Sequence, residues 1–416
     1  MLILEQTISI KVRLKLNQPT DSIEFQLLSD HFRRACNFVS AYIFNHDFVL
    51  NKNAIQKVIY RNLREQFELR SQLAISVIRT VVARYKAVKT QLKQKPYRYN
   101  TGKKNDQGKT IWRSISRDLT WLQNPLQFSR PQADLQRERD WSKRKDGTLS
   151  VAGFHHRVIV KPICCGFDQY LDGTWKLGVA KLLKTNGKWY LHIAATKVLS
   201  ILKNEQVNNV VGLDRGMRFL TNTFDSHQHS LFFNGKGIMN KRRQYKKLRT
   251  KLQRKGTKSA KRRLKQIGQR ENRWMTAVNH QITKALVDYY GPNTMFVLED
   301  LTGIRHATEK SRRDVRYERV SWAFYQFEQF LIYKANLNHC LVVKVDAHYT
   351  SQRCPRCGQI KKNNRDHQLH QYRCDHCGYS SNDDRIGAMN IQELGKQYLS
   401  GVEEPHFVKL NQISMD

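Results

Sequence analysis

The sequence predicts a multidomain α/β protein that also contains a β-barrel. With 416 residues the chain is long enough for two or three domains. Short segments of high β-propensity, separated by turn signals, fill residues 110 to 198. In the second half, strongly hydrophobic strand-like segments alternate with long helical patterns. We therefore expect a barrel in the first half and an α/β domain in the second.

The composition indicates a polyanionic partner. Lys and Arg number 73 against 35 Asp and Glu, which gives a net charge of +38. Because each phosphate contact uses about one cation, this excess suits a long nucleic acid better than a small neutral substrate. Hydrophobic residues make up 40% of the chain, enough for folded cores. Neither a secretory signal nor an apolar run of about 18 residues is visible, so we expect a cytoplasmic protein.

A helical lobe is expected soon after the first strand. Residues 8 to 16 alternate between apolar and polar side chains, which predicts a half-buried strand. Apolar residues at helical spacing predict helices from about 21 to 43, from 54 to 69 and from 71 to 95. The polar, basic segment 97 to 109 predicts a mobile loop.

The rest of the first half is expected to be β-structure. Strand-like runs separated by turn signals continue to residue 198, and Asn186-Gly187 is a favourable hairpin turn between two of them. The strand at residues 8 to 16 is expected to join this barrel or sandwich. A boundary is expected near residues 202 to 208.

Two buried strands in the second half each carry an acid at their carboxyl end. The segment VVGLD ends at Asp214, and TMFVLED carries Glu299. Strands at 219 to 224 and 231 to 233 should form a meander with the first of them, and CLVVKVD supplies a further strand.

A strongly basic helical segment lies between these two acids. Residues 236 to 273 contain 17 Lys or Arg and one acid, Glu271. They form either a solvated helical hairpin or a helix pair that lies on phosphates, and the net charge favours the second interpretation.

A zinc ribbon is predicted by two Cys-x-x-Cys pairs. Cys354 and Cys357 are separated by 16 residues from Cys374 and Cys377, a spacing typical of four-cysteine zinc sites. A redox dithiol is the alternative, but such motifs rarely come as a matched pair. Four thiolates already complete a tetrahedral zinc, so three nearby histidines are not expected as ligands: His367, His370 and His376.

The ribbon either serves folding alone or also contacts nucleic acid. Four basic side chains make such contact plausible: Lys361, Lys362, Arg365 and Arg373. The remaining cysteines lie in apolar surroundings and are expected to be buried: Cys36, Cys164, Cys165 and Cys340. The polar tail from 401 to 416 is expected to be disordered.

A third acid, Asp384, stands at the start of a helix after the ribbon. Acids from three distant positions that converge on one sheet can hold two Mg²⁺ ions about 3.5–4 Å apart, as in two-metal nucleases. We expect Asp214, Glu299 and Asp384 to be catalytic and to bind Mg²⁺.

The chain resembles the TnpB (OrfB) proteins of insertion sequences, which are related to compact type V CRISPR effectors. The resemblance rests on VVGLDRG, on Asn279-His280 before Gly291, and on VLEDL, YTSQRCPRCG, YRCDHCGY and NDDRIGAMNI. These motifs span residues 205 to 395. Weaker similarity extends to RPQADLQRERDWS and SVIRTVVARYK.

The resemblance implies a domain organisation. A wedge β-barrel is interrupted by a helical recognition lobe and followed by an RNase H-like (RuvC) nuclease domain with a zinc-ribbon insert that binds target nucleic acid. The implied ranges are 1–18 and 110–202 for the barrel, 19–109 for the recognition lobe, 203–347 for the nuclease domain with its basic segment 236–290, 348–380 for the ribbon, 381–400 for the third nuclease motif and 401–416 for a flexible tail.

The resemblance also implies an activity, a transposon-encoded, Mg²⁺-dependent, RNA-guided DNA endonuclease in the prokaryotic cytoplasm or nucleoid. The implied partners are a guide RNA from the transposon end and double-stranded target DNA with a short adjacent motif, bound by a monomer with one RNA. Position by position, the nuclease acids are Asp214, Glu299 and Asp384.

The third motif departs from the family pattern Asp-x-Asn-Ala-Ala, because Arg385-Ile386-Gly387-Ala388 follows Asp384 and Asp383 precedes it. The assignment within this acid pair favours Asp384. A catalytically silent RNA-guided DNA-binding protein, or a transposase or its accessory protein, are the alternative functions.

Overall fold

The computed structural model describes residues 3 to 408, except 165, 217, 302–323 and 367. Its contacts divide the chain into two compact units, which we call the N-terminal unit (Thr7–Lys197) and the C-terminal unit (Met1–Gln6 with Val198–Asp416). The expectations for Cys165, His367 and residues 409–416 lie outside the described residues. Four short 3-10 helices are η1 (Leu119–Trp121), η2 (Asp168–Tyr170), η3 (Asn204–Gln206) and η4 (Lys362–Asn364).

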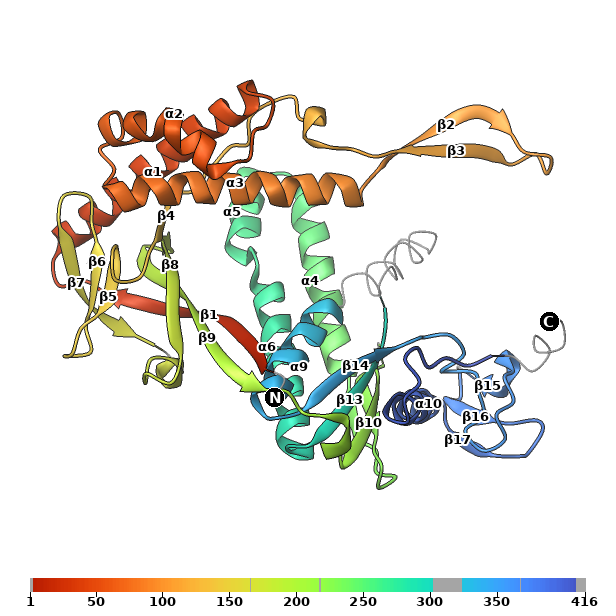
Figure 1. Cartoon of the computed structure of the whole chain (residues 1–416). Coiled ribbons are helices and arrows are strands. Elements are labelled where there is room, and N and C mark those ends of the chain that lie inside the picture. The colour runs from red at the N-terminus through yellow and green to blue at the C-terminus, as the bar shows by residue number, and fades with distance from the viewer. Residues whose placement is uncertain (1–2, 165, 217, 302–323, 367, 409–416) are drawn as a thin grey trace. The chain divides into compact units, whose positions relative to one another are not determined.

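Three helices form one part of the N-terminal unit (Figure 1): α1 (Pro19–Asn45), α2 (Lys52–Glu65) and α3 (Ser71–Gln94). They confirm the three helices predicted from hydrophobic periodicity. Phe25, Phe32 and Val39 of α1 are fully buried, as are Val77 and Tyr85 of α3. Burial of these large apolar side chains provides the main stabilisation of the lobe.

The second part of the N-terminal unit is a seven-stranded sheet of order β4-β8-β9-β1-β7-β6-β5. Its strands are β1 (Ile3–Lys15), β4 (Gln132–Leu135), β5 (Trp141–Lys143), β6 (Leu149–Ala152), β7 (Arg157–Ile163), β8 (Lys176–Thr185) and β9 (Lys188–Ser200). The indole of Trp141 in the edge strand β5 donates to the carbonyl of Gly178 in β8, at 3.2 Å. Because this bond links opposite ends of the strand order, the sheet forms a nearly closed barrel that includes the predicted first strand.

The prediction of a mobile loop at 97 to 109 is wrong. The chain there forms a hairpin of β2 (Tyr97–Lys104) and β3 (Thr110–Ile115). The side chain of Asn105 accepts hydrogen bonds from the backbone of Gln107 and Lys109, and so holds the connecting turn. The polar composition concealed this hairpin because few of its residues are buried, so no apolar face marks the strands.

The C-terminal unit is built on a five-stranded sheet of order β12-β11-β10-β13-β14. Its strands are β10 (Asn209–Asp214), β11 (Phe219–Phe224), β12 (Phe232–Asn234), β13 (Thr294–Glu299) and β14 (Leu341–Val345). The strands β10, β11 and β12 are antiparallel, whereas β10, β13 and β14 are parallel. This arrangement confirms the predicted meander and the three buried strands.

Helices cover both faces of this sheet, which explains why its central strands are hydrophobic throughout. On one face Val211 and Phe296 pack with α6 (Arg270–Tyr290) and α9 (Phe324–Leu337). On the other face Val210 and Val297 pack with α10 (Asp383–Leu399). Alternate residues of each strand thus serve opposite layers.

The basic segment contains α4 (Lys236–Lys255) and α5 (Lys258–Ile267), which pack against each other before α6 begins. A buried ion pair between Arg242 of α4 and Glu271 of α6, at 3.4 Å, ties the segment to the rest of the unit. The predicted helical hairpin is confirmed. That it lies on phosphates stays a prediction.

The insert with the four predicted zinc ligands lies between β14 and α10 and contains β15 (Arg365–Asp366), β16 (Gln371–Arg373) and β17 (Ser380–Asn382). The expectation of a disordered tail is wrong for its first part, because Phe407 is buried against the α10 side of the sheet. Three of the remaining cysteines are buried as predicted: Cys36, Cys164 and Cys340. None of the described helices is long and apolar enough to cross a membrane.

Candidate functional site

The three predicted acids come from neighbouring elements of the C-terminal unit. Strands β10 and β13 are parallel, with Leu213 opposite Leu298, so Asp214 and Glu299 occupy the same edge of the sheet. Asp384 lies in the first turn of α10, which packs on β10. The structure therefore brings together residues that are separated by up to 170 positions in the sequence.

The three carboxylates are close but do not form a compact chelate. Groups whose ligand atoms all lie within 4.8 Å are, among the described residues, the four ribbon cysteines and His370 with Asp383 and Asp384. A two-metal site is wider than this, because two cations about 3.5–4 Å apart with bonds of about 2.1 Å place ligands up to about 8 Å from one another. Asp214, Glu299 and Asp384 do not form such a compact group, so a site shared by all three would have to be of this wider kind.

Burial and the negative charges nearby make it unfavourable for these three acids to ionise when no cation is bound. Burial, followed by the charges of Glu299 and Asp384, raises the pKa of Asp214 to about 7. Burial also raises the pKa of Glu299, and burial together with Asp383 raises that of Asp384. Carboxylates that repel one another in a desolvated site gain most from a bound divalent cation.

Three side chains that the sequence did not single out orient the two strand-end acids. The hydroxyl of Thr350 donates to Oε1 of Glu299 at 2.5 Å. The amide of Asn222 in β11 lies 3.4 Å from Oδ2 of Asp214. The buried guanidinium of Arg215 donates to the backbone carbonyl of Glu299 at 2.5 Å and so links the ends of β10 and β13. Arg215 and Thr350 lie within the quoted motifs VVGLDRG and YTSQRCPRCG, but nothing in the sequence signals that they contact Glu299.

Arg365 joins the ribbon to the acid pair that begins α10. Its Nε lies 3.0 Å from Oδ2 of Asp383, and its Nη2 lies 3.1 Å from Oδ1 of Asp384. The Arg365 side chain is 18% exposed and holds both carboxylates in place from a strand of the ribbon. That it also contacts nucleic acid stays a prediction.

The two adjacent acids differ in accessibility. The side chain of Asp383 is 1% exposed, whereas that of Asp384 is 17% exposed. Oδ2 of Asp384 is buried and has no hydrogen-bond partner. An anionic oxygen in this state is costly unless a cation binds it. Oδ1 of Asp383 is likewise buried without a hydrogen-bond partner. Only the greater exposure of the Asp384 side chain therefore favours Asp384 over Asp383 as the acid that would face a metal ion.

Two glycines allow α10 to approach the acids closely. A Cβ on Gly387 would lie 2.8 Å from Oδ2 of Asp214. A Cβ on Gly212 would lie 2.5 Å from the backbone nitrogen of Gln392 and would also meet the carbonyl of Ala388. The strand β10 and the helix α10 thus pack almost backbone to backbone, which brings Asp384 to Asp214.

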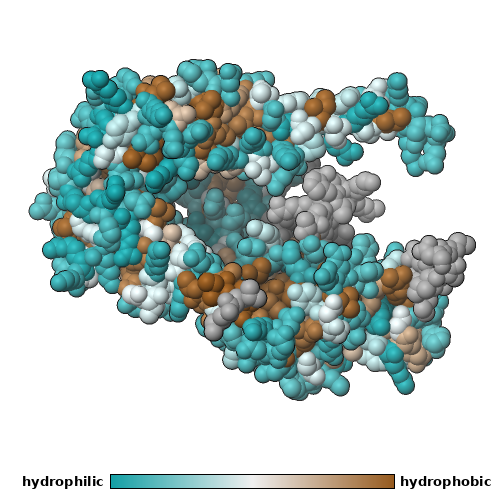
Figure 2. Space-filling model, viewed as in Figure 1, coloured by the Kyte–Doolittle hydropathy of each residue, from teal (hydrophilic) through white to brown (hydrophobic). Residues whose placement is uncertain are grey.

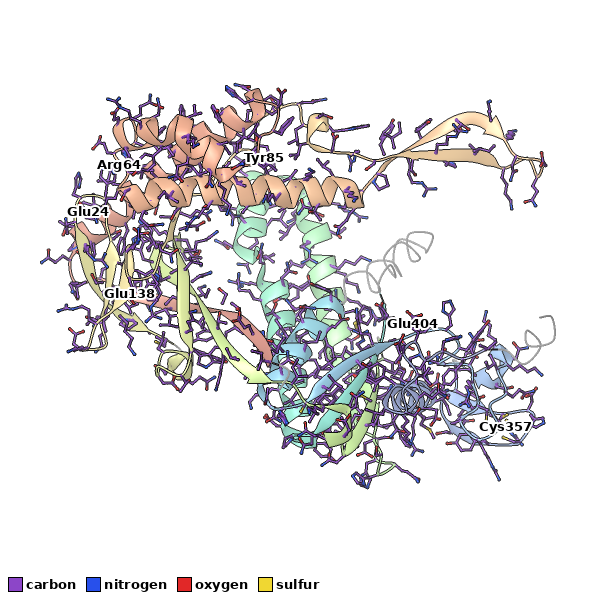
Figure 3. The ribbon with its side chains drawn as sticks, viewed as in Figure 1. Glu24, Arg64, Tyr85, Glu138, Cys357 and Glu404 are labelled. Carbon is purple, nitrogen blue, oxygen red and sulfur yellow. The ribbon has the colours of Figure 1, made fainter. Side chains whose placement is uncertain are left out.

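The four ribbon cysteines form a second candidate metal centre. Their Sγ atoms all lie within 4.8 Å of one another. Cys354 and Cys377 are 3.6 Å apart, as are Cys357 and Cys374; Figure 3 labels Cys357 in the insert. A tetrahedral zinc with Zn–S bonds of about 2.3 Å requires sulfur atoms about 3.8 Å apart. The donor set and its spacing therefore fit zinc.

We expect the Cys374→Ser variant to lose about one bound zinc per chain, because three thiolates bind zinc far less tightly than four. The variant should also melt at a lower temperature, since β17 leads directly into α10. Metal analysis by mass spectrometry and a thermal melt would test this. Cys36→Ala, which removes a buried thiol from the N-terminal unit, should retain its zinc. Equal zinc content in both variants would contradict the assignment.

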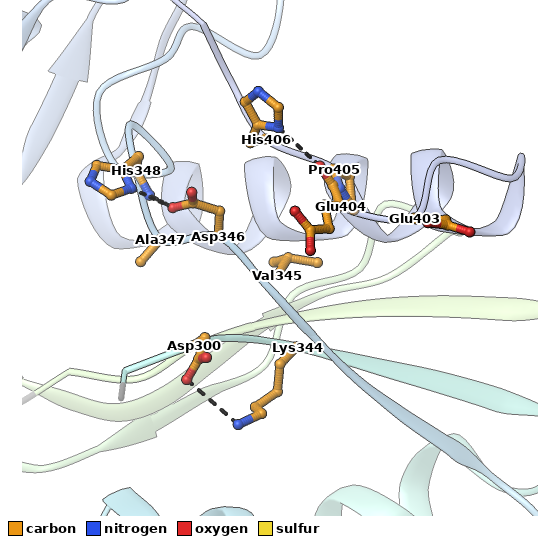
Figure 4. Close-up of a pocket in the computed structure, with 10 residues that line it drawn as sticks. All are labelled: Asp300, Lys344, Val345, Asp346, Ala347, His348, Glu403, Glu404, Pro405 and His406. Carbon is orange, nitrogen blue, oxygen red and sulfur yellow. Dashed lines mark hydrogen bonds and ion pairs between the residues drawn. The ribbon is translucent and has the colours of Figure 1, made fainter. Parts of the chain in front are cut away.

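A pocket of about 600 Å³ opens next to β14 and the C-terminal segment (Figure 4). It is lined partly by Asp300, Asp346, His348, Glu404 and His406. His348 and Asp346 pair with each other at 2.6 Å. Asp300, which lines the pocket, directly follows Glu299 in the sequence. None of the three predicted acids lines the pocket.

A basic surface lies along α4. A shallow hollow of about 670 Å³ is lined by Arg243, Lys246, Lys247, Thr250, Lys251, Arg254 and Lys255. Six cations on one helix face form a strong anion-binding surface.

Two family models match parts of the chain. One is described as "Probable transposase" (OrfB of IS605) and covers residues 192–303, and the other is the Cas12f1-like TNB domain over residues 324–391. A CRISPR-associated endodeoxyribonuclease Cas12f1 of Sulfoacidibacillus thermotolerans is 29% identical over 246 residues, which are 54% of this chain and 55% of that protein. The chain is similar to the TnpB and Cas12f1 proteins. The resemblance predicted from the sequence is confirmed.

Two further comparisons agree with this relationship. A TnpB-like protein of Methanocaldococcus jannaschii is 30% identical over 29% of this chain and 43% of that protein. A cryo-EM structure of a Cas12f1–sgRNA–target DNA complex contains a chain of similar fold, with a TM-score of 0.55 and 12% identity over 90% of this chain and 83% of that one. The chain spans about half the length of the Cas12f1 and TnpB-like proteins that it matches.

The raised pKa of Asp214 predicts a pH-dependent stability. Between its pKa in the unfolded chain, about 3.9, and about 7 in the folded protein, the folded state binds more protons. Stability is therefore lost as the pH rises through this range, and the loss is complete above pH 7. Without divalent cations, the melting temperature of Asp214→Asn should be higher than that of the unsubstituted protein at pH 8. Near pH 4 the two melting temperatures should be equal.

Each 1 kcal/mol gained by removing the buried charge, with its desolvation cost and its repulsion by Glu299 and Asp384, would raise the melting temperature by about 2–4 °C. Saturating Mg²⁺ should reverse the order at pH 8, because only the protein with Asp214 gains the full binding energy. Asp288→Asn, at an exposed acid of α6, is the matched control and should show neither effect. A melting temperature of Asp214→Asn that stays below that of the unsubstituted protein at every pH would contradict the predicted cost of burying a charged Asp214.

Proposed function

We propose that the chain is a transposon-encoded, RNA-guided DNA endonuclease that hydrolyses phosphodiester bonds in guide-matched DNA. The observation that carries the proposal is the convergence of Asp214, Glu299 and Asp384 at one edge of the sheet, beside a four-cysteine insert. The name of the Cas12f1 relative describes an endodeoxyribonuclease, and the similar fold comes from a complex with RNA and DNA. The net charge of +38 suits both nucleic acids.

The nuclease domain of this proposal is RNase H-like (RuvC) and comprises residues 203–347 and 381–400, with the ribbon at 348–380 as an insert. The mixed five-stranded sheet with helices on both faces supports this assignment. The barrel at 1–18 and 110–202 and the helical lobe at 19–109 then serve as the wedge and recognition parts. Residues 401–416 are the proposed tail.

Asp214, Glu299 and Asp384 would hold Mg²⁺ ions, and the buried Oδ2 of Asp384 without a hydrogen-bond partner fits such a role. When bound, two Mg²⁺ ions activate a water and stabilise the leaving oxygen. Thr350 and Arg215 keep Glu299 in place, while Arg365 keeps Asp384 oriented until substrate arrives. Zinc on Cys354, Cys357, Cys374 and Cys377 would hold the ribbon strands next to α10.

The proposed partners are one guide RNA from the transposon end and double-stranded DNA with a short adjacent motif, bound by a monomer in the prokaryotic cytoplasm. Target sequence would be read by base pairing, with Lys and Arg on the backbone of the hybrid. The test is to sequence the RNA that co-purifies with the protein, and then to incubate the complex with matched and mismatched duplexes and Mg²⁺. Cleavage of the matched duplex alone is expected. Binding without cleavage would instead indicate a catalytically silent guided binder, and absence of a defined RNA would indicate a transposase or its accessory protein.

A further inference from the structure

The hairpin β2–β3 of the N-terminal unit exposes large side chains on both of its faces. Tyr97 is paired with Ile115, and Tyr99 with Arg113, so these four share one face. Asn100 is paired with Trp112 on the opposite face. Trp112 is 55% exposed and Tyr97 49% exposed. Every residue of β3 is exposed, so the residues that the structure describes cover neither face of this two-stranded ribbon.

Such a ribbon is poorly stabilised by itself. An isolated pair of strands is only marginally stable in water, and exposed aromatic clusters commonly mark an interaction site. Figure 1 shows β2 and β3 extending away from α3, and Figure 2 shows hydrophobic residues among hydrophilic ones along this arm. At its base, Tyr97 packs on Trp121 with ring centroids 5.5 Å apart. The base of the ribbon is thus held, while the rest of it is exposed.

The charge of the ribbon identifies the partner as a polyanion. Residues 97 to 117 contain six cations and one acid, Asp106. The cations lie on both strands, in the turn and just after β3: Arg98, Lys103, Lys104, Lys109, Arg113 and Arg117. Arginine guanidinium groups bind phosphates in bidentate geometry, and aromatic rings interspersed with them are typical of nucleic-acid-binding surfaces.

The distribution of these side chains over two faces indicates how the polyanion is bound. A ribbon that lies flat on a surface needs cations on one face, whereas Arg98 and Arg113 belong to opposite faces. Opposed cations suit a groove with a phosphate backbone on either side. The major groove of B-form DNA is about 12 Å wide and admits a two-stranded β-ribbon. The major groove of an A-form duplex is too narrow for side chains to enter.

We propose that the β2–β3 ribbon inserts into the major groove of B-form duplex DNA, with Arg98 and Arg113 on opposite backbones and Trp112 against the groove wall. This inference adds a duplex-DNA contact to the proposed function and rests on it only in taking DNA as a partner. The ribbon then engages the part of the DNA that is still double-stranded, rather than a hybrid with RNA.

The test uses the full-length protein with its co-purified RNA and a 30-base-pair duplex that does not match the RNA. Arg98→Ser with Arg113→Ser should weaken binding at least tenfold. It should also make the slope of log K against log salt shallower by about 2, since each phosphate contact contributes about 0.9. Trp112→Ser should weaken binding several-fold with the salt slope unchanged. The control Lys57→Ser with Lys145→Ser removes two exposed cations elsewhere in the same unit and should leave the slope unchanged.

Two results would overturn the inference: a ribbon variant with the salt slope of the control, or an equal loss of affinity for an A-form RNA duplex of the same length. All variants should melt within about 1 °C of the unsubstituted protein, because the substituted side chains are exposed. The probe does not match the RNA, so the outcome is independent of guided cleavage. If no matched DNA is cut but the slope still falls, the proposed function fails while the ribbon contact stands.

Discussion

Asp214→Ala and Glu299→Ala are each expected to lower Mg²⁺-dependent cleavage of guide-matched DNA by at least 100-fold. Loss of a side chain that merely supports a metal ligand commonly costs 10–100-fold, so loss of the ligand itself should cost more. Both acids lie at the same sheet edge, and each variant removes an anion from a site that two cations would share. Cleavage is measured on a labelled matched duplex across a series of Mg²⁺ concentrations.

Guide RNA should remain bound in both variants, because neither acid belongs to the basic surface of α4. The matched control is Asp288→Ala, an exposed acid of α6 that pairs with Lys284 and should cut normally. In the acid pair, Asp384→Ala should be as damaging as Asp214→Ala. Asp383→Asn should be milder, because the side chain of Asp383 is almost inaccessible. Full cutting by Asp214→Ala would show that the cleavage centre lies elsewhere.

The second large effect is expected at a residue with no chemical function. Gly212→Ala places a methyl group between β10 and α10, against the backbone of Gln392 and Ala388. Overpacking a core commonly costs about 1–3 kcal/mol, and backbone atoms cannot rotate away as a side chain can. We expect the upper end of this range, which corresponds to a fall in melting temperature of roughly 6–12 °C. Displacement of α10 should also reduce cleavage, because it separates Asp384 from Asp214.

The matched control is Gly178→Ala in strand β8. A methyl group there would meet Ala194 at 3.6 Å, which is an ordinary contact, so melting temperature and cleavage should stay near those of the unsubstituted protein. Retained stability together with lost cleavage in Gly212→Ala would point to a local displacement of Asp384. If Gly212→Ala changed neither the melting temperature nor the cleavage, β10 and α10 could separate at no cost, which would contradict their close packing.

Local patterns in the sequence were enough for the secondary structure around the site. The hydrophobic runs that end at Asp214 and near Glu299 predicted two buried strands, and both occur where expected. The Cys-x-x-Cys pairs predicted a four-thiol cluster, and the four sulfur atoms do lie together. The prediction for segment 97–109 was wrong because neither face of the hairpin is buried. Its strands therefore show no sustained alternation of apolar and polar residues.

Contacts between distant residues were beyond the reach of such patterns. Arg365 was considered only as a possible nucleic-acid contact because it is basic and close to the cysteines, and its ion pairs with Asp383 and Asp384 were not foreseen. Phe407 was placed in a disordered tail, although it packs in the core beside α10. In both cases the side chain type is compatible with either environment, and only the path of the chain decides between them.

The sequence by itself determined the strongly cationic character of this protein, the identity of the acids and thiols, and the strands and helices that carry most of them. These properties follow from composition, spacing and periodicity, which are local. The tertiary structure alone decided how near the acids lie to one another, which of Asp383 and Asp384 is accessible, and why position 212 is glycine. Those features depend on packing between β10 and α10, whose facing residues are about 180 positions apart, and no local pattern encodes the distance between two backbones.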